Sequence, residues 1–365
     1  MSPRLPRVSF VIDDLGHGGA QRQLWLTAAA LAGRVDVHVV SMSSTVDPYA
    51  RRLANDAVAV TVLVRRSGLE PGRLRALMRC LRASRPDVVH GVLGASNAYA
   101  FIAARVLRIP VVLSLRSDRL GVTDARARVL GWMLRHADAV TVNSRAGLRY
   151  LTASAGLPES HLVFVPNIVA VDAPAPHAPT HAPVVGCVGR LVEVKRFDAV
   201  IAAMSMVRER VPSARLVVVG DGPCRDSLQA AARALADAVE FTGAVDDAAP
   251  LIAGFACLVV ASEHEGIPNA ALEALDLGVP VAAVRAGDLP ELVVEGVTGT
   301  VARDGSPAAL ADAITRALTD GGLRDSARRE GPRMIRERFS SDRTRDLLVA
   351  LYHRLGTKAG AAPRG

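Results

Sequence analysis

The chain alternates short apolar segments of strand length with longer amphipathic segments of helix length along most of its course. This alternation is typical of repeated βαβ units, which form a parallel sheet covered by helices on both faces. In the first half it predicts strands at residues 7–12, 35–41, 58–63, 87–90, 110–114, 138–142 and 162–165. Helices are expected between most of them, for example at 20–32, 71–84, 96–107 and 124–136.

A proline-rich segment interrupts the alternation near the middle of the chain. Residues 169–183 contain prolines at positions 174, 176, 179 and 183, a density that indicates a semi-rigid linker. Beyond this segment the alternation restarts. Strands are expected at 184–189, 214–219, 238–242, 256–260 and 280–284, and helices at 196–210, 225–236, 268–277, 306–319, 323–337 and 341–355.

A length of 365 residues suits two domains better than one. We therefore expect an α/β fold of two doubly wound, Rossmann-like domains that face each other across a cleft. The N-terminal domain would span 1–168, the linker 169–183 and the C-terminal domain 184–340. Residues 341–365 would form a helix that packs back on the N-terminal domain, followed by a tail. Ligand sites are expected beyond the carboxyl ends of the strands, at the cleft.

The composition excludes several classes of protein. Half of the residues are apolar and 22% are charged, which rules out a disordered chain. No apolar run reaches the ~18 residues of a membrane-spanning helix, and the run at 8–12 is too short for a signal peptide. The four cysteines are dispersed without metal-ligand spacing, which favours a reducing compartment. We expect a cytoplasmic protein.

The formal net charge of +8 leaves two interpretations of the basic surface open. No basic run is interleaved with aromatic residues, so no nucleic-acid partner is expected. A peripheral contact with an anionic membrane, at the inner face of the cytoplasmic membrane, is one interpretation, and an ordinary solvated basic face is the other. The candidate arginines for membrane contact are Arg65, Arg66, Arg73, Arg75, Arg79 and Arg82.

Glycine-rich turns follow two of the expected strands. Residues 16–21, which include Gly18 and Gly19, follow the first strand, and residues 220–223, which begin with Gly220, follow a later one. Both lack the third glycine of the dinucleotide-binding fingerprint, so that fingerprint is absent. The first turn is either a tight strand-to-helix connection or a contact to an anion or a sugar. The second is more simply a strand-to-helix turn.

Two basic residues follow a strand that is expected to end at Gly189. Arg190 and Lys195 lie in the loop that leads from this strand into the next helix. At the carboxyl end of a strand they would clamp a diphosphate, Arg with a planar fork of donors and Lys with a point charge. The alternative is a pair of solvated basic residues, in a chain with 44 lysines and arginines.

The most specific motif spans residues 263–275 and follows an apolar strand. Gly266 permits close approach of the backbone, and a helix is expected to begin near Ile267, with Asn269 in its first turn. Because the N–H groups at a helix N-terminus have no partners within the helix, this end favours a negatively charged ligand.

Two carboxylates of this motif are eight positions apart. Glu273 lies one turn beyond Asn269 on a helix whose other residues are almost all apolar. A buried carboxylate requires a partner, and it accepts hydrogen bonds from two vicinal hydroxyls, as a ribose presents them. Glu265, the other carboxylate, precedes the helix.

In this order, the motifs resemble the GT-B glycosyltransferases of family 4 over nearly the whole chain. The matching residues are Gly18-Gly19-Ala20, Asn143-Ser144, Val165-Pro166-Asn167, Gly189-Arg190-Leu191 with Lys195, Gly220-Asp221-Gly222-Pro223, Glu265 with Glu273, Gly278-Val279-Pro280, and Phe339 to Tyr352. The resemblance implies retaining transfer of a sugar from a nucleotide-sugar donor to a hydroxyl of a glycan or lipid-linked acceptor, as in bacterial cell-surface polysaccharide synthesis. The C-terminal domain would bind the donor and the N-terminal domain the acceptor.

The resemblance also implies which residues form the site. Carried over to this sequence, Arg190 and Lys195 hold the diphosphate and Glu273 holds the ribose. Glu265 holds the sugar and phosphate together with the amides of Gly266 and Ile267. The remaining donor-binding residues are Asn269, Gly189 and Gly220, and the acceptor or phosphate loop contains Gly18 and Gly19. No cofactor and no divalent metal are expected, and the sequence contains no Asp-x-Asp.

One departure from the family pattern leaves alternatives open. Many relatives carry His-x-His at the end of the fourth strand, where this chain has His90-Gly91-Val92. His90 is either a catalytic contact to a sugar or a core histidine with satisfied hydrogen bonds. A nucleotide-sugar epimerase on the same fold and a non-catalytic partner subunit are the alternative functions. Release of an isomerised free nucleotide sugar would identify the epimerase.

Overall fold

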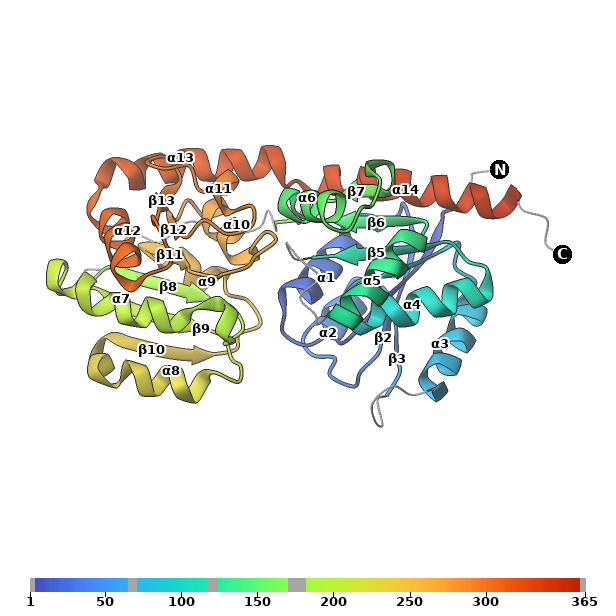
Figure 1. Cartoon of the computed structure of the whole chain (residues 1–365), viewed down its shortest axis with the longest axis horizontal. Helices are drawn as coiled ribbons and strands as arrows, with labels where there is room; N and C mark the ends of the chain where they lie inside the picture. The colour runs from blue at the N-terminus through green and yellow to red at the C-terminus, as the bar shows by residue number, and fades with distance from the viewer. Residues whose placement is uncertain (1–3, 65–70, 117–123, 170–181, 362–365) are drawn as a thin grey trace. The chain divides into compact units, whose positions relative to one another are not determined.

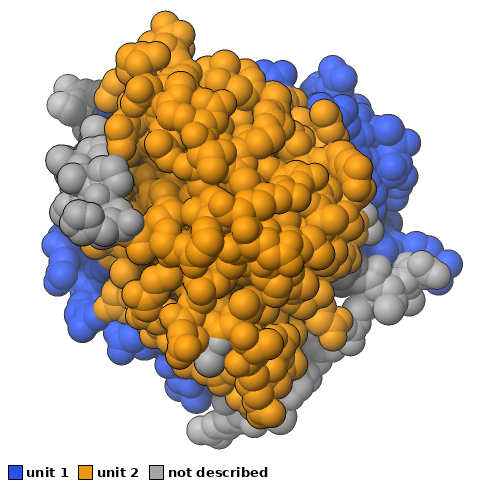
Figure 2. Space-filling view, turned by 90° about the vertical axis from the view of Figure 1, so that its left-hand side faces the viewer, with its two compact units in different colours: residues 1–168, 341–365 blue, residues 169–340 orange. Residues whose placement is uncertain are grey.

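The computed structural model describes residues 4–64, 71–116, 124–169 and 182–361 (Figure 1). The chain divides into two compact units, shown in blue and orange in Figure 2. Unit 1 comprises Met1–Ile168 and Ser341–Gly365, and unit 2 comprises Val169–Ser340. Each unit contains one parallel sheet between layers of helices, so the predicted α/β fold class is confirmed. Most of the predicted linker lies outside the described residues, as do Arg65 and Arg66.

Unit 1 is built on a seven-stranded sheet with the order β3-β2-β1-β4-β5-β6-β7. Its strands are β1 (Arg7–Ile12), β2 (Asp36–Ser41), β3 (Ala59–Val62), β4 (Val88–Gly91), β5 (Val111–Leu115), β6 (Ala139–Val142) and β7 (Leu162–Phe164). Its helices are α1 (Gly19–Leu31), α2 (Tyr49–Asn55), α3 (Pro71–Ser84), α4 (Gly94–Leu107), α5 (Asp124–His136), α6 (Arg145–Ala153) and α14 (Ser341–Ala361).

Two hydrophobic cores hold these helices on opposite faces of the sheet. One core contains Leu77 of α3, Ala103 of α4 and Leu134 of α5. The other contains residues of α1 and α2 together with Tyr352 of α14. Neighbouring strand residues such as Val88 and Val89 belong to different cores, as expected when successive side chains point to opposite faces. The last helix of the chain therefore completes the core of the first unit.

One of the candidate arginines for membrane contact is buried. Arg73 donates hydrogen bonds to the Met42 carbonyl at 2.9 Å and the Tyr99 hydroxyl at 3.2 Å, and its guanidinium lies over the Tyr99 ring. Contact of Arg73 with a membrane is therefore a wrong prediction, because its side chain lies on the buried side of α3, as Leu77 does. In contrast, the other three arginines of α3 are exposed: Arg75, Arg79 and Arg82.

Unit 2 is built on a six-stranded sheet with the order β10-β9-β8-β11-β12-β13. Its strands are β8 (Val184–Val188), β9 (Arg215–Val219), β10 (Val239–Gly243), β11 (Cys257–Val260), β12 (Val281–Ala283) and β13 (Gly299–Val301). Its helices are α7 (Phe197–Arg210), α8 (Arg225–Ala231), α9 (Ala249–Ala253), α10 (Asn269–Asp276), α11 (Leu289–Leu292), α12 (Pro307–Thr319) and α13 (Gly321–Arg338).

The observed elements that the sequence patterns missed are short. They include β13, which has three residues, and the helices α2, α9 and α11, which have seven, five and four. Periodicity over so few residues is too weak to distinguish an element from a loop. Among the described residues, no helix is both long and apolar enough to cross a membrane.

Candidate active site

The sheet order of unit 2 fixes where a ligand site can form. In open α/β sheets ligands bind beyond the carboxyl ends of the strands, where the strand order reverses. In unit 2 this reversal lies between β8 and its neighbour β11. The basic loop with Arg190 and Lys195 follows β8, and the acidic motif with Glu265 follows β11. The topology therefore brings the two predicted motifs to one edge of the sheet.

Lys195 and Glu265 are in direct contact at this edge. The Lys195 ammonium donates to Oε1 of Glu265, and both side chains are largely buried, 25% and 11% exposed. The Ser262 hydroxyl donates to the same carboxylate oxygen at 2.7 Å. The backbone fixes this arrangement, because the Glu263 amide donates to the Val194 carbonyl at 3.0 Å. A cation and an anion from loops 70 residues apart in sequence thus form one site.

Glycines allow the loops after β8 and β9 to touch through their backbones. The Gly189 amide donates to the Val219 carbonyl at 2.9 Å. Gly220 has a φ of +136°, and a Cβ atom placed on it would lie 1.9 Å from the Gly189 carbonyl oxygen. A side chain at Gly220 would therefore push apart the loops after β8 and β9.

The N-terminus of α10 lies directly after this pair in the chain. α10 begins at Asn269 behind Pro268, and its first turn contains no acidic residue. The Gly266 carbonyl accepts a hydrogen bond from the Asp288 amide at 3.2 Å, which ties the loop before the helix to the loop after β12. The positive end of the helix dipole is therefore not neutralised by a carboxylate of its own first turn.

Glu273 lies on α10 with buried neighbours on either side. Its own side chain is half-buried, whereas Leu272 and Ala274 are buried almost completely. The helix packs closely on α13, where a Cβ atom on Gly331 would lie 2.4 Å from the Leu275 carbonyl. Arg190 is exposed, and its side chain has no hydrogen bond or ion pair with another side chain among the described residues.

A pocket of about 460 Å³ opens beside the Lys195–Glu265 pair in unit 2. Its walls are the loops after β11, β12 and β13 together with Arg196, and its charged residues are Arg196, Glu263, Arg285, Arg303 and Asp304. Its volume lies within the range of ligand pockets. None of the residues that the sequence assigned to the donor lines it. The sequence patterns did not single out the basic side chains that surround this pocket.

The predicted loop of unit 1 also lies at a reversal of strand order. Gly18 and Gly19 follow β1, which is flanked by β2 and β4 at the reversal. Gly19 begins α1, and Gly18 has extended backbone with a φ of 176° that any residue can adopt. The Asp13 carboxylate accepts from the Ser96 amide at 2.6 Å, so this turn is joined to the start of α4.

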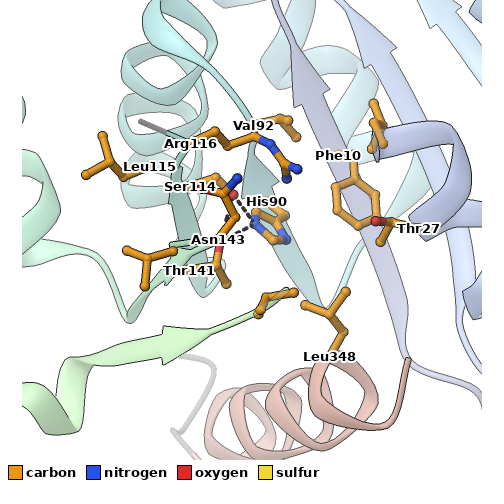
Figure 3. A pocket seen from close by; sticks show the side chains of 13 residues that line it. Phe10, Thr27, His90, Val92, Ser114, Leu115, Arg116, Thr141, Asn143 and Leu348 are labelled. Atoms are coloured by element: carbon orange, nitrogen blue, oxygen red, sulfur yellow. Dashed lines mark hydrogen bonds between the residues drawn. The ribbon is translucent and has the colours of Figure 1, made fainter. Parts of the chain in front are cut away.

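His90 lies inside unit 1, and both of its ring nitrogens are in hydrogen bonds. Figure 3 shows the bonds of its ring to Ser114 and Thr141. Nδ1 is 2.8 Å from the Tyr352 hydroxyl, and Nε2 is 2.8 Å from the Ser114 hydroxyl and 3.2 Å from that of Thr141. The residue is 4% exposed and borders a cavity of about 30 Å³. Of the two interpretations that the sequence left open, this environment favours the core histidine with satisfied hydrogen bonds.

The stability of unit 1 is expected to fall on acidification because of His90. Burial and, to a lesser extent, the Arg116 cation lower the pKa of His90 from 6.5 to about 3. Below pH 6.5 the unfolded chain takes up a proton that the folded chain does not bind until about pH 3. Each pH unit in this window should therefore lower the free energy of unfolding by about 1.4 kcal/mol.

Both tryptophans of the chain, Trp25 and Trp132, lie in unit 1, so their fluorescence reports its unfolding. Urea titrations at pH 7 and pH 5 should show the expected loss in the wild type and a smaller loss in His90→Gln. The exposed His353 provides the matched control, since His353→Gln should retain the full pH dependence. An identical pH dependence in His90→Gln and wild type would contradict this assignment.

Arg116 lines the small cavity beside His90, and the sequence patterns did not single it out. It follows β5 and donates to Oδ1 of Asn167 at 2.7 Å, and Asn143 donates to the same oxygen at 3.1 Å. Burial lowers the pKa of Arg116 to about 10. Oδ1 of Asn143 is buried without a partner among the described residues. The position of Arg116 directly after an apolar strand was the signal that could have found it.

No group of three or more His, Cys, Asp or Glu side chains is arranged to hold a metal ion in the described parts of the chain. The groups gathered at the edge of unit 2 are instead a lysine, several arginines, a helix N-terminus and two glutamates.

Family models match both units of the chain. A model described as Glycosyltransferase Family 4 matches residues 17–173, and one described as Glycosyl transferases group 1 matches residues 182–320. The GDP-mannose-dependent alpha-(1-6)-phosphatidylinositol monomannoside mannosyltransferase of Mycolicibacterium smegmatis is 38% identical over 207 residues, which cover 50% of this chain and 53% of that enzyme. This match spans about half the length of that relative.

Two further comparisons cover nearly the whole chain. The D-inositol 3-phosphate glycosyltransferase of Actinosynnema mirum is 29% identical, with 92% of each chain covered. The crystal structure of Anabaena HepE in complex with UDP-glucose superposes with a TM-score of 0.85 and 20% identity, and covers 95% of this chain and 99% of HepE. With family models on both units and a whole-chain structural match, the chain belongs to the GT-B glycosyltransferases of family 4, and it is a glycosyltransferase.

Proposed function

We propose that this glycosyltransferase moves a sugar from a nucleotide-sugar donor to a hydroxyl of a glycan or lipid-linked acceptor, with retention of configuration and without a metal ion. The observation that carries the proposal is the contact of Lys195 with Glu265 at the strand reversal of unit 2, directly before the N-terminus of α10. One cation, one carboxylate and one helix end are thereby grouped where the fold class binds its ligands.

The main electrostatic task in this reaction is to stabilise the leaving group. When the bond between the sugar C1 and the phosphate oxygen breaks, negative charge accumulates on the nucleoside diphosphate. Lys195, Arg190 and the N-terminus of α10 provide positive charge and N–H donors for it. Because the N–H groups at the start of α10 are held in place by the helix, they do not have to reorganise as the charge develops.

The two glutamates have binding roles in this proposal. Glu265 exchanges its contact with Lys195 for hydroxyls of the donor sugar, which leaves the ammonium for the diphosphate. Glu273 accepts hydrogen bonds from the two ribose hydroxyls. The acceptor oxygen attacks C1 on the face from which the phosphate leaves, and its proton passes to a phosphate oxygen of the leaving diphosphate.

The relatives support an acceptor that carries a phosphate or a lipid. The mannosyltransferase relative is named for a phosphatidylinositol monomannoside acceptor and a GDP-mannose donor, and the full-length relative for D-inositol 3-phosphate. The HepE structure contains UDP-glucose. We therefore place this chain in the synthesis of a bacterial glycolipid or cell-surface polysaccharide, where it would contact the membrane that carries its acceptor.

A donor screen tests the proposed reaction without a known acceptor. Each common UDP-, GDP-, ADP- and dTDP-sugar is incubated with the enzyme, and release of the nucleoside diphosphate is measured. One donor should be hydrolysed slowly, and the first sugar product should have the anomeric configuration of the donor. An isomerised nucleotide sugar would instead identify an epimerase, and tight donor binding with no turnover would identify a partner subunit.

Activity is expected to survive removal of divalent cations. The physical reason is that Lys195, Arg190 and the α10 N-terminus together supply the positive charge that a metal ion supplies in other glycosyltransferases. Donor hydrolysis should therefore keep its rate in EDTA within about 2-fold, since each 1.4 kcal/mol of lost stabilisation would cost 10-fold. Loss of activity in EDTA that manganese or magnesium restores would contradict this proposal.

A further inference from the structure

Most of the net charge of this chain is concentrated in three neighbouring helices of unit 1. Helices α3, α4 and α5 contain eight arginines and a single acidic residue, Asp124. Their formal charge is therefore +7, against +8 for the whole chain. The three helices pack side by side in one core on one face of the sheet (Figure 1).

Within the described parts of the chain, the arginines on the outer side of α3 have no carboxylate partner. Arg75, Arg79 and Arg82 are exposed, and none of them contacts a carboxylate among the described residues. On the opposite face of the sheet, Arg345 of α14 pairs with both Asp342 and Asp346. Unpaired like charges on one face repel one another, so this face is poised to bind an anionic surface.

Large apolar side chains are exposed on the same three-helix face. On α4, Ile102 and Val106 are 40% and 59% exposed, and on α5, Val129 and Trp132 are 54% and 51% exposed. The inner side of α4 is also buried in the core, so this helix is apolar nearly all round. A helix of this kind is normally buried on all sides, and an exposed one indicates a binding surface.

Trp132 lies where α4 and α5 meet. Its ring contacts the edge of Phe101 of α4 with centroids 5.5 Å apart and stacks on His136 at 4.5 Å. These contacts fix the indole in place while half of it stays exposed. Tryptophan in this setting suits the interface between water and lipid, where its apolar ring and polar N–H are both accommodated.

We propose that the outer face of α3, α4 and α5 docks on an anionic lipid bilayer. The arginines bind the negative headgroups, and Trp132 inserts with the exposed aliphatic side chains at the boundary of headgroups and acyl chains. A nucleic acid fits less well, because Ile102, Val106 and Val129 gain nothing from a phosphate backbone. This inference deepens the proposed lipid-linked acceptor, but its test does not depend on turnover.

Docking through this face leaves the carboxyl ends of the unit 1 strands, where ligands are expected to bind, accessible. Each of these helices returns the chain from the carboxyl end of one strand to the amino end of the next. Val106, Trp132 and Arg82 lie in the second halves of their helices and thus towards the amino ends of the strands. Gly18, Gly19 and Arg116 follow carboxyl ends, so docking does not cover them.

The test is sedimentation with vesicles of phosphatidylglycerol and phosphatidylcholine in equal parts, against vesicles of phosphatidylcholine alone. The wild type should bind only the anionic vesicles, and high salt should weaken binding. The variant Arg79→Glu with Arg82→Glu should bind about 30-fold or more weakly, because each basic residue at such a surface contributes roughly 5-fold. Trp132→Ser should bind about 10-fold more weakly, because less apolar area is buried.

The matched control reverses two exposed arginines of unit 2 that lie outside the proposed site. Arg215→Glu with Arg329→Glu changes the net charge equally and should bind anionic vesicles like the wild type. In a Trp25→Phe background Trp132 is the only tryptophan, and its fluorescence should shift to the blue with anionic vesicles. Donor hydrolysis in solution should be unchanged in all these variants, which separates a docking defect from a failed enzyme.

Three outcomes would overturn the proposal. The first is an equal loss of binding in the unit 2 control, which would mean that net charge alone drives adsorption. The second is that the α3 and Trp132 variants bind anionic vesicles as tightly as the wild type and that the emission of Trp132 does not shift. The third is binding to duplex or single-stranded nucleic acid that is tighter than binding to vesicles at equal phosphate concentration, which would make this face a nucleic-acid surface.

Discussion

Lys195→Met is expected to lower the kcat of sugar transfer by about 10²- to 10³-fold, the usual effect of removing one preorganised group that stabilises transition-state charge. The Lys195 ammonium contacts Glu265 and lies at the strand reversal of unit 2. Once the donor is bound, it is the cation best placed to face the leaving diphosphate. Methionine retains most of the length of the side chain, so the change removes charge with little change in packing.

The loss should depend on the charge of the ligand. Isothermal titration should show that Lys195→Met weakens binding of the nucleoside diphosphate much more than binding of the uncharged nucleoside. Lys195→Arg should recover part of the activity, because the charge is restored although the donor geometry differs. Equal losses for the diphosphate and the nucleoside would show that Lys195 only supports the fold.

A matched control is available on the same unit. Arg210 forms an exposed ion pair with Asp312, with both side chains about half exposed. Exposed ion pairs contribute only about 0 to 1 kcal/mol, so Arg210→Met should leave both kcat and donor affinity near the wild-type values. Thermal unfolding of both variants then shows whether any change at Lys195 reflects stability rather than chemistry.

The meeting of the basic and acidic motifs at one edge of the unit 2 sheet was predictable from the sequence because it depends on topology. The strands at 184–188 and 257–260 follow clear apolar patterns, and the motifs after them carry the charged residues. Once both strands are in one parallel sheet, their following loops meet at one edge. The contact between Lys195 and Glu265 was not predictable, because it depends on the conformation of two loops that no local pattern specifies.

The environment of His90 was beyond sequence patterns for a different reason. Its partner Tyr352 lies 262 residues later, on the helix that completes the core of unit 1. No periodicity links residues that far apart, so both interpretations of this histidine had to stay open. Arg73, by contrast, carried a usable signal. Arg73, Leu77 and Leu81 follow one another at helical spacing, and the two leucines already marked that side of α3 as buried.

Glu273→Ala is expected to weaken donor binding by about 10²- to 10⁴-fold. The change removes a charged acceptor to which two ribose hydroxyls would donate, and each such hydrogen bond is worth roughly 1.5 to 3 kcal/mol. Alanine is the best helix former, and the side chain at this position is only half-buried, so α10 should form normally. Circular dichroism and thermal unfolding should therefore match the wild type.

The ribose assignment is tested with a donor that lacks both ribose hydroxyls. The wild type should bind the 2′,3′-dideoxy donor as weakly as Glu273→Ala binds the normal donor, and the variant should no longer distinguish the two donors. Asp276→Asn is the matched control, since Asp276 is a half-buried carboxylate on the same helix whose pKa is raised to about 6 chiefly by burial, with Arg336 nearby. This control should retain full discrimination between the donors. If Glu273→Ala still discriminated as strongly as the wild type, the carboxylate would have no contact with the ribose, and the two glutamates of the motif would have to be assigned to other parts of the donor.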